Sequence, residues 1–166
     1  MRHIRANSAR TLLLVRLLQL KLYNQMVEAL RLFELTPLQY LVLSLAGYSS
    51  SSSTADLARR FEITPQSMNE VIAALEVKKL IARRESPGHR RILHIRLTAA
   101  GTRLLRRCDV EVDQIERFAF RDFSGMELAA FRGMISKALA GFEENAGSRP
   151  PAALASVANN GHRANE

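Results

Sequence analysis

Five arginines flank a Ser-Pro-Gly-His turn in the stretch RRESPGHRRILHIR, which spans residues 83–96. Pro87 and Gly88 favour a tight turn, and the alternation of apolar and polar residues that follows is typical of a β-strand. Like charges on neighbouring strand positions repel one another and add nothing to a hydrophobic core. The stretch therefore predicts a β-hairpin whose arginines contact a negatively charged partner.

A second candidate surface precedes this hairpin, in a helix predicted over residues 65–79. At helical spacing, one face is apolar and the opposite face carries Gln66, Glu70 and Ala73, with Asn69 beside them. Gln and Asn can pair with adenine edges, Glu can accept a hydrogen bond from cytosine, and Ala permits close approach. An ordinary amphipathic surface helix would look similar, and the basic hairpin after it favours binding in the major groove of DNA.

The charge of the chain is concentrated in the same region. The chain carries 24 Lys and Arg against 16 Asp and Glu, a formal net charge of +8. Residues 54–107 hold 12 of the basic residues and five of the acidic ones, whereas acidic residues are in excess after residue 107. A localised positive excess indicates a polyanion as partner.

Three short helices are predicted in the first half of the chain from their start signals. These signals are Thr36 with Pro37, Ser53 with Asp56, and Thr64 with Pro65. The helices should end near Gly47, Phe61 and Lys79. The second and third form a helix-turn-helix candidate, and strands over 81–85 and 92–97 should then form the hairpin.

Longer apolar helices are predicted at both ends of this region. Residues 10–33 are rich in leucine on more than one side, which is typical of a helix covered by two partners. A helix with an apolar stripe starts at Thr98, and Ser124 with Glu127 forms a capping box for another. Residues 146–166 have no usable periodicity, so we expect a disordered tail.

Catalytic and metal-binding patterns are missing from the sequence. The four histidines, His3, His89, His94 and His162, do not have the spacing of a helical metal pair. The sequence also lacks a phosphate-binding glycine loop and a nucleophile elbow. We therefore expect a protein that is not an enzyme, with no catalytic residue, metal or cofactor.

Cys108 is the single cysteine, which excludes an internal disulfide framework and fits a reducing compartment. It lies on an apolar stripe, so we expect core packing, although Arg106 and Arg107 nearby leave redox sensing as an alternative. Arg16 and Lys21 interrupt the apolar N-terminal run, which argues against a signal peptide and a membrane helix. We expect a cytoplasmic protein.

Three stretches occur in a characteristic order and spacing within residues 10–145. They are LTPLQYLVLSLAG, TADLARRFEITPQSMNEVIAALEVKKLIARR and PGHRRILHIRLTAAG. Together they resemble the MarR family of bacterial transcriptional regulators. The resemblance implies a mainly α fold with a small β-hairpin wing, a winged helix-turn-helix whose N- and C-terminal dimerisation helices intertwine. It divides the chain into a dimerisation helix (1–35), a DNA-binding domain (36–98), further dimerisation helices (99–145) and the tail.

The resemblance implies a homodimeric repressor that reads a palindromic operator in double-stranded DNA. The helix over 65–79 would enter the major groove and the wing over 83–96 the minor groove. By position, the base-facing residues would be Gln66, Ser67, Asn69, Glu70 and Ala73. Arg91 would be the wing-tip arginine, and Arg83, Arg84 and Arg90 would flank it or contact phosphates.

The resemblance also implies release from DNA by a small aromatic or phenolic effector. Its pocket would lie between the dimerisation helices and the winged helix, where polar and aromatic residues of the first two helices could line it. The candidates are Arg16, Gln19, Tyr23 and Tyr40. Each of them is equally acceptable as a surface or interface residue.

Three positions depart from the usual family pattern. His89 stands where an aspartate usually braces the wing-tip arginine, so the wing should be looser. Glu70 replaces a basic or hydroxyl residue, which leaves the operator sequence open. Lys79 replaces a common glycine, so the helix must end without the residue that most easily adopts a positive φ.

An alternative of another class remains open at this point. The chain could be a dimeric interaction module whose basic hairpin docks an acidic protein or nonspecific nucleic acid. Such a surface would need only charge, whereas Gln66, Asn69 and Glu70 favour the reading of bases.

Overall fold

The structure is a computed structural model that describes residues 10–48, 53–86 and 89–144; the side chains at 85–86, 89–93 and 143–144 lie outside the description. Within these ranges the chain is mainly helical with one small antiparallel hairpin, as predicted. The expected tail over 146–166 lies outside the described residues. None of the described helices is long and apolar enough to cross a membrane.

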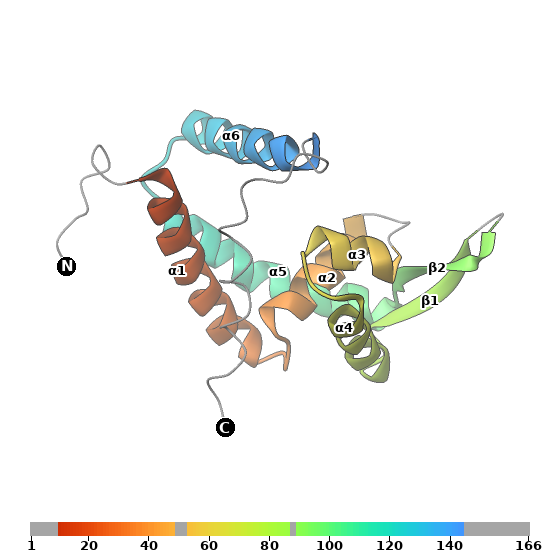
Figure 1. Ribbon diagram of the computed structural model, residues 1–166. Coiled ribbons are helices and arrows are strands. Elements are labelled where there is room, and N and C mark those ends of the chain that lie inside the picture. Colours follow the sequence, from red (N-terminus) through yellow and green to blue (C-terminus); the bar gives the residue numbers. More distant parts are fainter. Residues whose placement is uncertain (1–9, 49–52, 87–88, 145–166) are drawn as a thin grey trace, which may run out of the picture. The chain divides into compact units, whose positions relative to one another are not determined.

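The elements follow the predicted order, and Figure 1 shows their arrangement. They are α1 (Thr11–Arg31), α2 (Pro37–Tyr48), α3 (Thr54–Arg60), α4 (Pro65–Val77), β1 (Ile81–Ser86), β2 (His89–Leu97), α5 (Ala99–Ala119) and α6 (Gly125–Glu144). The strands are longer than predicted and α4 ends two residues before Lys79. The chain divides into two compact units, residues 1–119 and 120–166, which we describe separately.

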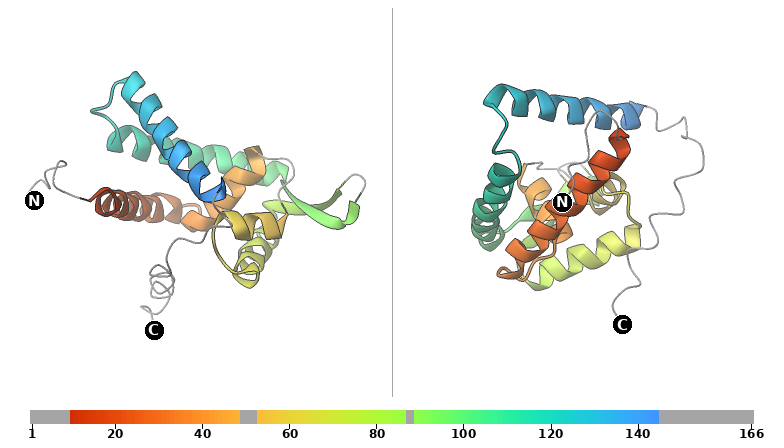
Figure 2. Two further views of the ribbon diagram at one scale, coloured as in Figure 1. Left: turned by 45° about the horizontal axis from the view of Figure 1, so that its top comes forward. Right: turned by 90° about the vertical axis from the view of Figure 1, so that its left-hand side faces the viewer.

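The first unit is built around α2. Helix α1 lies beside α5, α2 contacts α1, α4, α5 and β2, and α3 packs on α4 (Figures 1 and 2). The hairpin extends away from the helices (Figure 2). The largest fully buried side chains come from α1 to α5 and from β2: Leu30, Leu43, Leu57, Met68, Ile72, Leu75, Ile95, Val42 and Cys108. One continuous hydrophobic core therefore holds α4 and the root of the hairpin in place.

The predicted helix starts are confirmed by their hydrogen bonds. Ser53 Oγ accepts from the Asp56 amide at 3.2 Å, and Asp56 Oδ2 accepts from the Ser53 amide at 3.0 Å, which completes the capping box of α3. The hydrogen bond from the Ser53 hydroxyl, followed by the one from its amide, lowers the pKa of Asp56. Ser124 and Glu127 form the same box at α6.

The start of α5 lies directly against the segment that joins α4 to β1. A β-carbon at Gly101 would stand 1.9 Å from the carbonyl oxygen of Leu80, so only glycine fits there without movement. Thr98 Oγ1 donates to the carbonyl of Lys79 at 2.7 Å and accepts from the Gly101 amide at 3.0 Å. The Thr98 amide donates to the Leu80 carbonyl at 3.0 Å. The end of the hairpin is thereby joined to the end of α4.

The second unit contains α6 and the turn before it. The rings of Phe120, Phe123 and Phe131 form a cluster with centroids 5.5 to 5.8 Å apart. The apolar stripe predicted for α6 includes Leu139 and Phe142, which are 61% and 67% exposed. Within its own unit, α6 therefore leaves much of this stripe uncovered.

Candidate nucleic-acid interface

Helix α4 begins with a side-chain cap that fixes its first turn. Thr64 Oγ1 accepts from the Ser67 amide at 3.1 Å, and Pro65 occupies the first helical position. The hydroxyls of Thr64 and Ser67 also lie 2.9 Å apart, so the Ser67 hydroxyl is held at the helix start.

The two faces of α4 are those predicted from the sequence. Its inner face is anchored by three side chains with no exposed surface, Met68, Ile72 and Leu75. The five residues expected to face bases are all exposed: Gln66, Ser67, Asn69, Glu70 and Ala73. Val77, on the same outward side, is 82% exposed. Helix α4 thus presents hydrogen-bonding groups and small apolar groups together on one outward surface.

Helix α4 is followed by a residue with positive φ that is not a glycine. Lys79 has a φ of 57°, and its amide donates to the Glu76 carbonyl at 2.8 Å. Lys78 caps the helix and its ammonium donates to the carbonyl of Glu34, another residue with positive φ. The strain that a β-carbon adds at such a φ is offset by these bonds and by Thr98.

The hairpin that follows is antiparallel, as predicted. Arg83 lies opposite Ile95 and Arg84 opposite His94, so these two arginines project from opposite sides of the hairpin. The register is irregular between Glu85 and Ser86. Arg90 and Arg91 belong to the outer part of β2, and their side chains, like that of His89, lie outside the described residues.

Arg83 makes an ion pair that the sequence analysis did not anticipate. Its Nε lies 3.1 Å and 3.3 Å from the two carboxylate oxygens of Glu76, in the last turn of α4. The side chains remain 34% and 33% exposed. The available signal was a glutamate in the last turn of a helix with an arginine in the next strand. This signal was not sufficient, because the distance between Glu76 and Arg83 depends on the direction that the strand takes.

The root of β2 also contacts the start of α3. His94 forms an isolated β-bridge with Ser53, the residue that caps α3. The Nδ1 atom of His94 is buried and has no hydrogen-bond partner among the described residues. In addition to its root at Ile81 and Thr98, the wing is thus attached to the helix-turn-helix through Ser53 and through Glu76.

Tyr40 and Cys108 lie in the interior between α2 and α5. The Tyr40 hydroxyl donates to Asp109 Oδ1 at 2.9 Å, and burial, with the Asp109 carboxylate adding to it, raises the pKa of Tyr40 to about 12. Burial raises the pKa of the Cys108 thiol to about 11. Cys108 has no exposed surface, which confirms the predicted core packing. A thiol with this pKa is protonated at neutral pH and reacts slowly.

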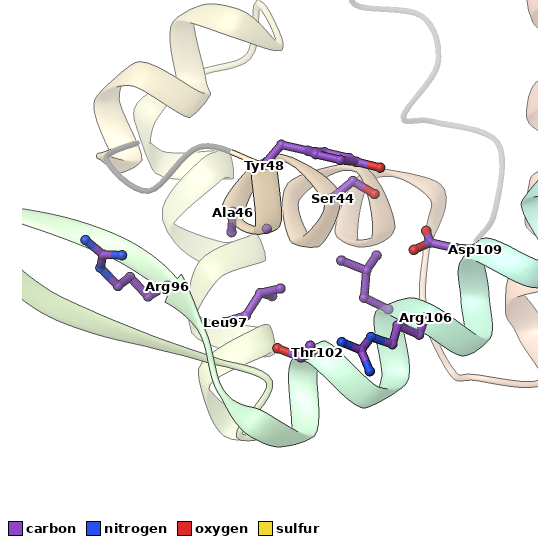
Figure 3. A pocket seen from close by; sticks show the side chains of 10 residues that line it. Ser44, Ala46, Tyr48, Arg96, Leu97, Thr102, Arg106 and Asp109 are labelled. Atoms are coloured by element: carbon purple, nitrogen blue, oxygen red, sulfur yellow. The ribbon is translucent and has the colours of Figure 1, made fainter.

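A cavity of about 390 Å³ opens between α2, the end of β2 and α5 (Figure 3). Apolar lining comes from Ala46, Leu97 and Leu105, and polar lining includes Arg96, Arg106, Asp109, Ser44, Tyr48 and Thr102. The Arg106 guanidinium beside an apolar floor suits an aromatic anion. The Asp109 carboxylate also lines the cavity, and the Arg96 guanidinium points away from the other labelled side chains (Figure 3). These residues come from two stretches, 44–48 and 96–109, that lie far apart in the sequence, so no local pattern indicated the cavity.

The four residues expected to bind an effector lie elsewhere. Arg16 donates to Gln19 at 2.7 Å on the exposed side of α1, and Tyr23 is 47% exposed on the same helix. Tyr40 is buried and contacts two residues of the cavity lining, Asp109 and Ser44. The lining of the cavity includes none of these four residues, and their role stays a prediction.

Comparisons with known proteins agree with this architecture. A profile of the MarR family matches residues 33–92, from the end of α1 into β2. The HTH-type transcriptional repressor Rv2887 of Mycobacterium tuberculosis is 31% identical over 103 residues, which are 62% of this chain and 74% of the repressor. The HTH-type transcriptional regulator YhbI of Bacillus subtilis is 28% identical over 119 residues, 70% of this chain and 77% of that protein.

The same likeness holds for solved structures. The crystal structure of Rv2887 in complex with DNA matches with a TM-score of 0.66 at 27% identity, over 79% of this chain and 98% of that chain. Its complex with salicylic acid matches with a TM-score of 0.64 at 28% identity, over 81% of this chain and 99% of that chain. Members of this family are transcriptional regulators and not enzymes. The chain belongs to the MarR family and is a winged helix-turn-helix transcriptional regulator.

Proposed function

We propose that the chain is a homodimeric repressor that binds a palindromic operator in double-stranded DNA in the cytoplasm. The observation that carries the proposal is the exposed polar face of α4 next to an arginine-rich hairpin. Hydrogen-bonding groups on a firmly packed helix suit base edges in the major groove, and arginines on a narrow hairpin suit the minor groove. The similar protein Rv2887 has been solved in complex with DNA, which supports DNA as the partner.

Different residues take different parts in this proposal. The base-reading side chains are Gln66, Ser67, Asn69, Glu70 and Ala73, all exposed on α4. Arg91 enters the minor groove, and Arg84 and Arg90 contact phosphates on either side of it. Phosphate contacts add affinity without sequence information, whereas contacts to bases supply the selectivity.

The homodimer is inferred from apolar surface that the single chain leaves in solvent. On α1, Leu12 and Val15 are 79% and 58% exposed, and on α6, Met126 and Phe142 are 84% and 67% exposed. Apolar surface of this extent marks contacts between proteins. We therefore assign the dimer interface to α1 and to residues 99–145, so that residues 36–98 remain available to DNA.

Selection of bound sites from random DNA, followed by footprinting, tests this function. We expect a palindrome whose half-sites are about 10 base pairs apart, or a multiple of one helical turn, with a protein dimer bound. A single asymmetric half-site bound by a monomer at micromolar concentration would contradict the proposal. Equal affinity for all sequences would favour the alternative in which the hairpin docks an acidic protein or nonspecific nucleic acid.

Two matched variants separate base reading from phosphate binding. Asn69→Ala should weaken binding to the selected site by about 1 to 3 kcal/mol and leave binding to random DNA nearly unchanged. Arg84→Gln should weaken both by similar amounts and reduce the salt slope by about one unit. Fluorescence titrations of both variants on both duplexes, at several salt concentrations, measure these differences.

We further propose that an aromatic carboxylate binds the cavity between α2, β2 and α5 and weakens DNA binding. Arg96 lines this cavity and belongs to the wing strand, while Arg106 faces it from α5, so an occupant would contact the wing and a dimerisation helix together. The salicylic acid complex of Rv2887 supports this class of effector.

Salicylate is the probe for this effector site. Millimolar salicylate should release wild-type protein from its operator, and Arg106→Gln should need about tenfold more, because a charge-assisted hydrogen bond is lost. Arg103→Gln removes the same charge from an exposed position of α5 that does not line the cavity, and should respond like the wild type. Equal responses of both variants would show that salicylate acts elsewhere.

A further inference from the structure

We infer that the Glu76–Arg83 ion pair sets the angle between the wing and the recognition helix, which makes both side chains positioning residues for DNA binding. The inference rests on the proposed function, because α4 and the wing must reach two grooves of one duplex at the same time. It assigns Arg83 a different task from Arg84, although the two arginines are neighbours in β1.

The direction of the Arg83 side chain follows from the register of the hairpin. Arg83 lies directly opposite Ile95, which has no exposed surface, and two residues after Ile81, which is 3% exposed. Residues opposite one another or two apart in a strand share one side of the hairpin. Arg83 is therefore on the side that packs against the core and α4, whereas Arg84 is on the other side with His94.

Glu76 occupies a position where a carboxylate needs a positive partner. It lies in the last turn of α4, where the carbonyl ends of the helix concentrate negative charge, and that turn contains no basic residue. The Arg83 Nε hydrogen shared between both carboxylate oxygens, at 3.1 Å and 3.3 Å, supplies the charge. Because only a third of each side chain is exposed, water screens this pair less than a fully exposed one.

The ion pair holds β1 at a point beyond the root of the strand. Ile81 anchors β1 at its root, and Arg83 provides a second attachment about 7 Å farther out, at roughly 3.4 Å per residue. The partner strand β2 is held separately, where His94 bridges Ser53, so the ion pair is the attachment that fixes β1 itself beyond its root. The far end of β1, at Ser86, lies about 17 Å from Ile81, so a pivot of 10° there displaces the wing by about 3 Å.

Removal of Glu76 gives the sharpest test, because the change in charge and the loss of wing positioning should then change DNA affinity in opposite directions. Glu76→Gln removes a negative charge near DNA, which by charge alone should strengthen binding to every duplex. If the pair positions the wing, the same variant should bind the selected operator about five- to tenfold more weakly, while random DNA of equal length is bound slightly more tightly. Operator affinity that stays equal or rises would overturn the inference.

The charge-swapped pair then separates positioning from phosphate contact. Glu76→Arg combined with Arg83→Glu keeps the net charge and should restore operator affinity to within about threefold of the wild type, with Arg83→Gln alone about five- to tenfold weaker at an unchanged salt slope. If Arg83 instead contacts a phosphate, Arg83→Gln lowers the slope by about one unit and the swap fails to rescue binding. Arg84→Gln is the matched control, with the same change one residue along the strand.

Different results would contradict the proposed function and the positioning role of the ion pair. Wild-type protein that binds operator and random DNA equally overturns the proposed function, and this inference falls with it. Wild-type protein that selects its operator while Glu76→Gln and Arg83→Gln both keep wild-type operator affinity overturns the positioning pair alone. Thermal unfolding of each variant, expected to match the wild type within a few degrees, ensures that all of them are compared in the folded state.

Discussion

Helices α4 and α6 both leave side chains in solvent, and the chemistry of those side chains is opposite. The exposed residues of α4 include Gln66, Asn69 and Glu70, whose polar groups water can satisfy. The exposed residues of α6 include Met126, Leu139 and Phe142, at 84%, 61% and 67%. Water hydrates the first surface at little cost, whereas burying each large apolar side chain of the second would gain about 1.5 to 3 kcal/mol.

The difference indicates two kinds of partner. A polar surface that is stable in water can exchange its hydration for base edges and release them again, as a regulator must. An apolar surface favours a partner that remains bound, as in a stable protein dimer. We therefore expect substitutions in α6 to change assembly and substitutions on the outer face of α4 to change DNA selection, with little crossover between the two.

The largest effect is expected from charge on the apolar surface. Leu139→Glu combined with Phe142→Glu should weaken the dimer by about 4 kcal/mol, roughly a thousandfold, because two apolar contacts are lost and two carboxylates would be buried. Sedimentation equilibrium measures the shift to monomer. Gln66→Ala on α4 is the control and should leave the dimer intact. An unchanged dimer in the double variant would break the assignment of α6 to the interface.

The next largest effect compares the two faces of α4 itself. Leu75 has no exposed surface and Val77 is 82% exposed. Leu75→Ala should lower the free energy of unfolding by about 3 kcal/mol through lost burial and a residual cavity, whereas Val77→Ala should change it by less than about 0.5 kcal/mol. Urea denaturation of both variants checks this. Similar losses for both would mean that α4 does not pack as described.

A smaller and selective effect is expected at the tip of the wing. Arg91→Ala should cost about 1 to 3 kcal/mol on operators with a narrow, A·T-rich flank and less on G·C-rich flanks, because the narrow groove concentrates negative potential. Titrations at fixed salt on the two flanks measure the difference. Equal losses on both flanks would reduce Arg91 to a phosphate contact.

The smallest effect is expected at Cys108, which belongs to neither surface. Cys108→Ala should cost about 1 kcal/mol of stability and leave DNA release by peroxide unchanged. Burial raises the pKa of this thiol from 9.0 to about 11, so folding favours its protonated form. The stability from this group is complete below pH 9 and is lost as the pH rises toward 11, a loss that the variant should lack. Peroxide release that depends on Cys108 would instead support redox sensing.

Much of the fold could be predicted because its signals are local. Ser53 with Asp56 and Ser124 with Glu127 are capping boxes that need only four consecutive residues, and both are present. The alternation from Ile92 to Leu97 predicted a strand in the same way, and β2 includes these residues. The outward face of α4 followed from helical spacing alone.

The features that could not be predicted depend on pairs distant in the sequence. Tyr40 and Asp109 are 69 positions apart, and their hydrogen bond exists only because α2 packs against α5. The cavity likewise forms only because the end of β2 lies beside α2 and α5. Arg83 was assigned to phosphate with its neighbours, since charge alone does not reveal which arginine meets a carboxylate of its own chain.

At Gly101 two backbone segments contact each other directly, with no side chain between them. Most packed elements are separated by side chains, which can change rotamer and absorb small displacements. At Gly101 the backbone of α5 meets the Leu80 carbonyl with no room for even a methyl group between them. A tilt of α5, whether it comes from assembly or from an occupant of the neighbouring cavity, must therefore also displace the end of α4.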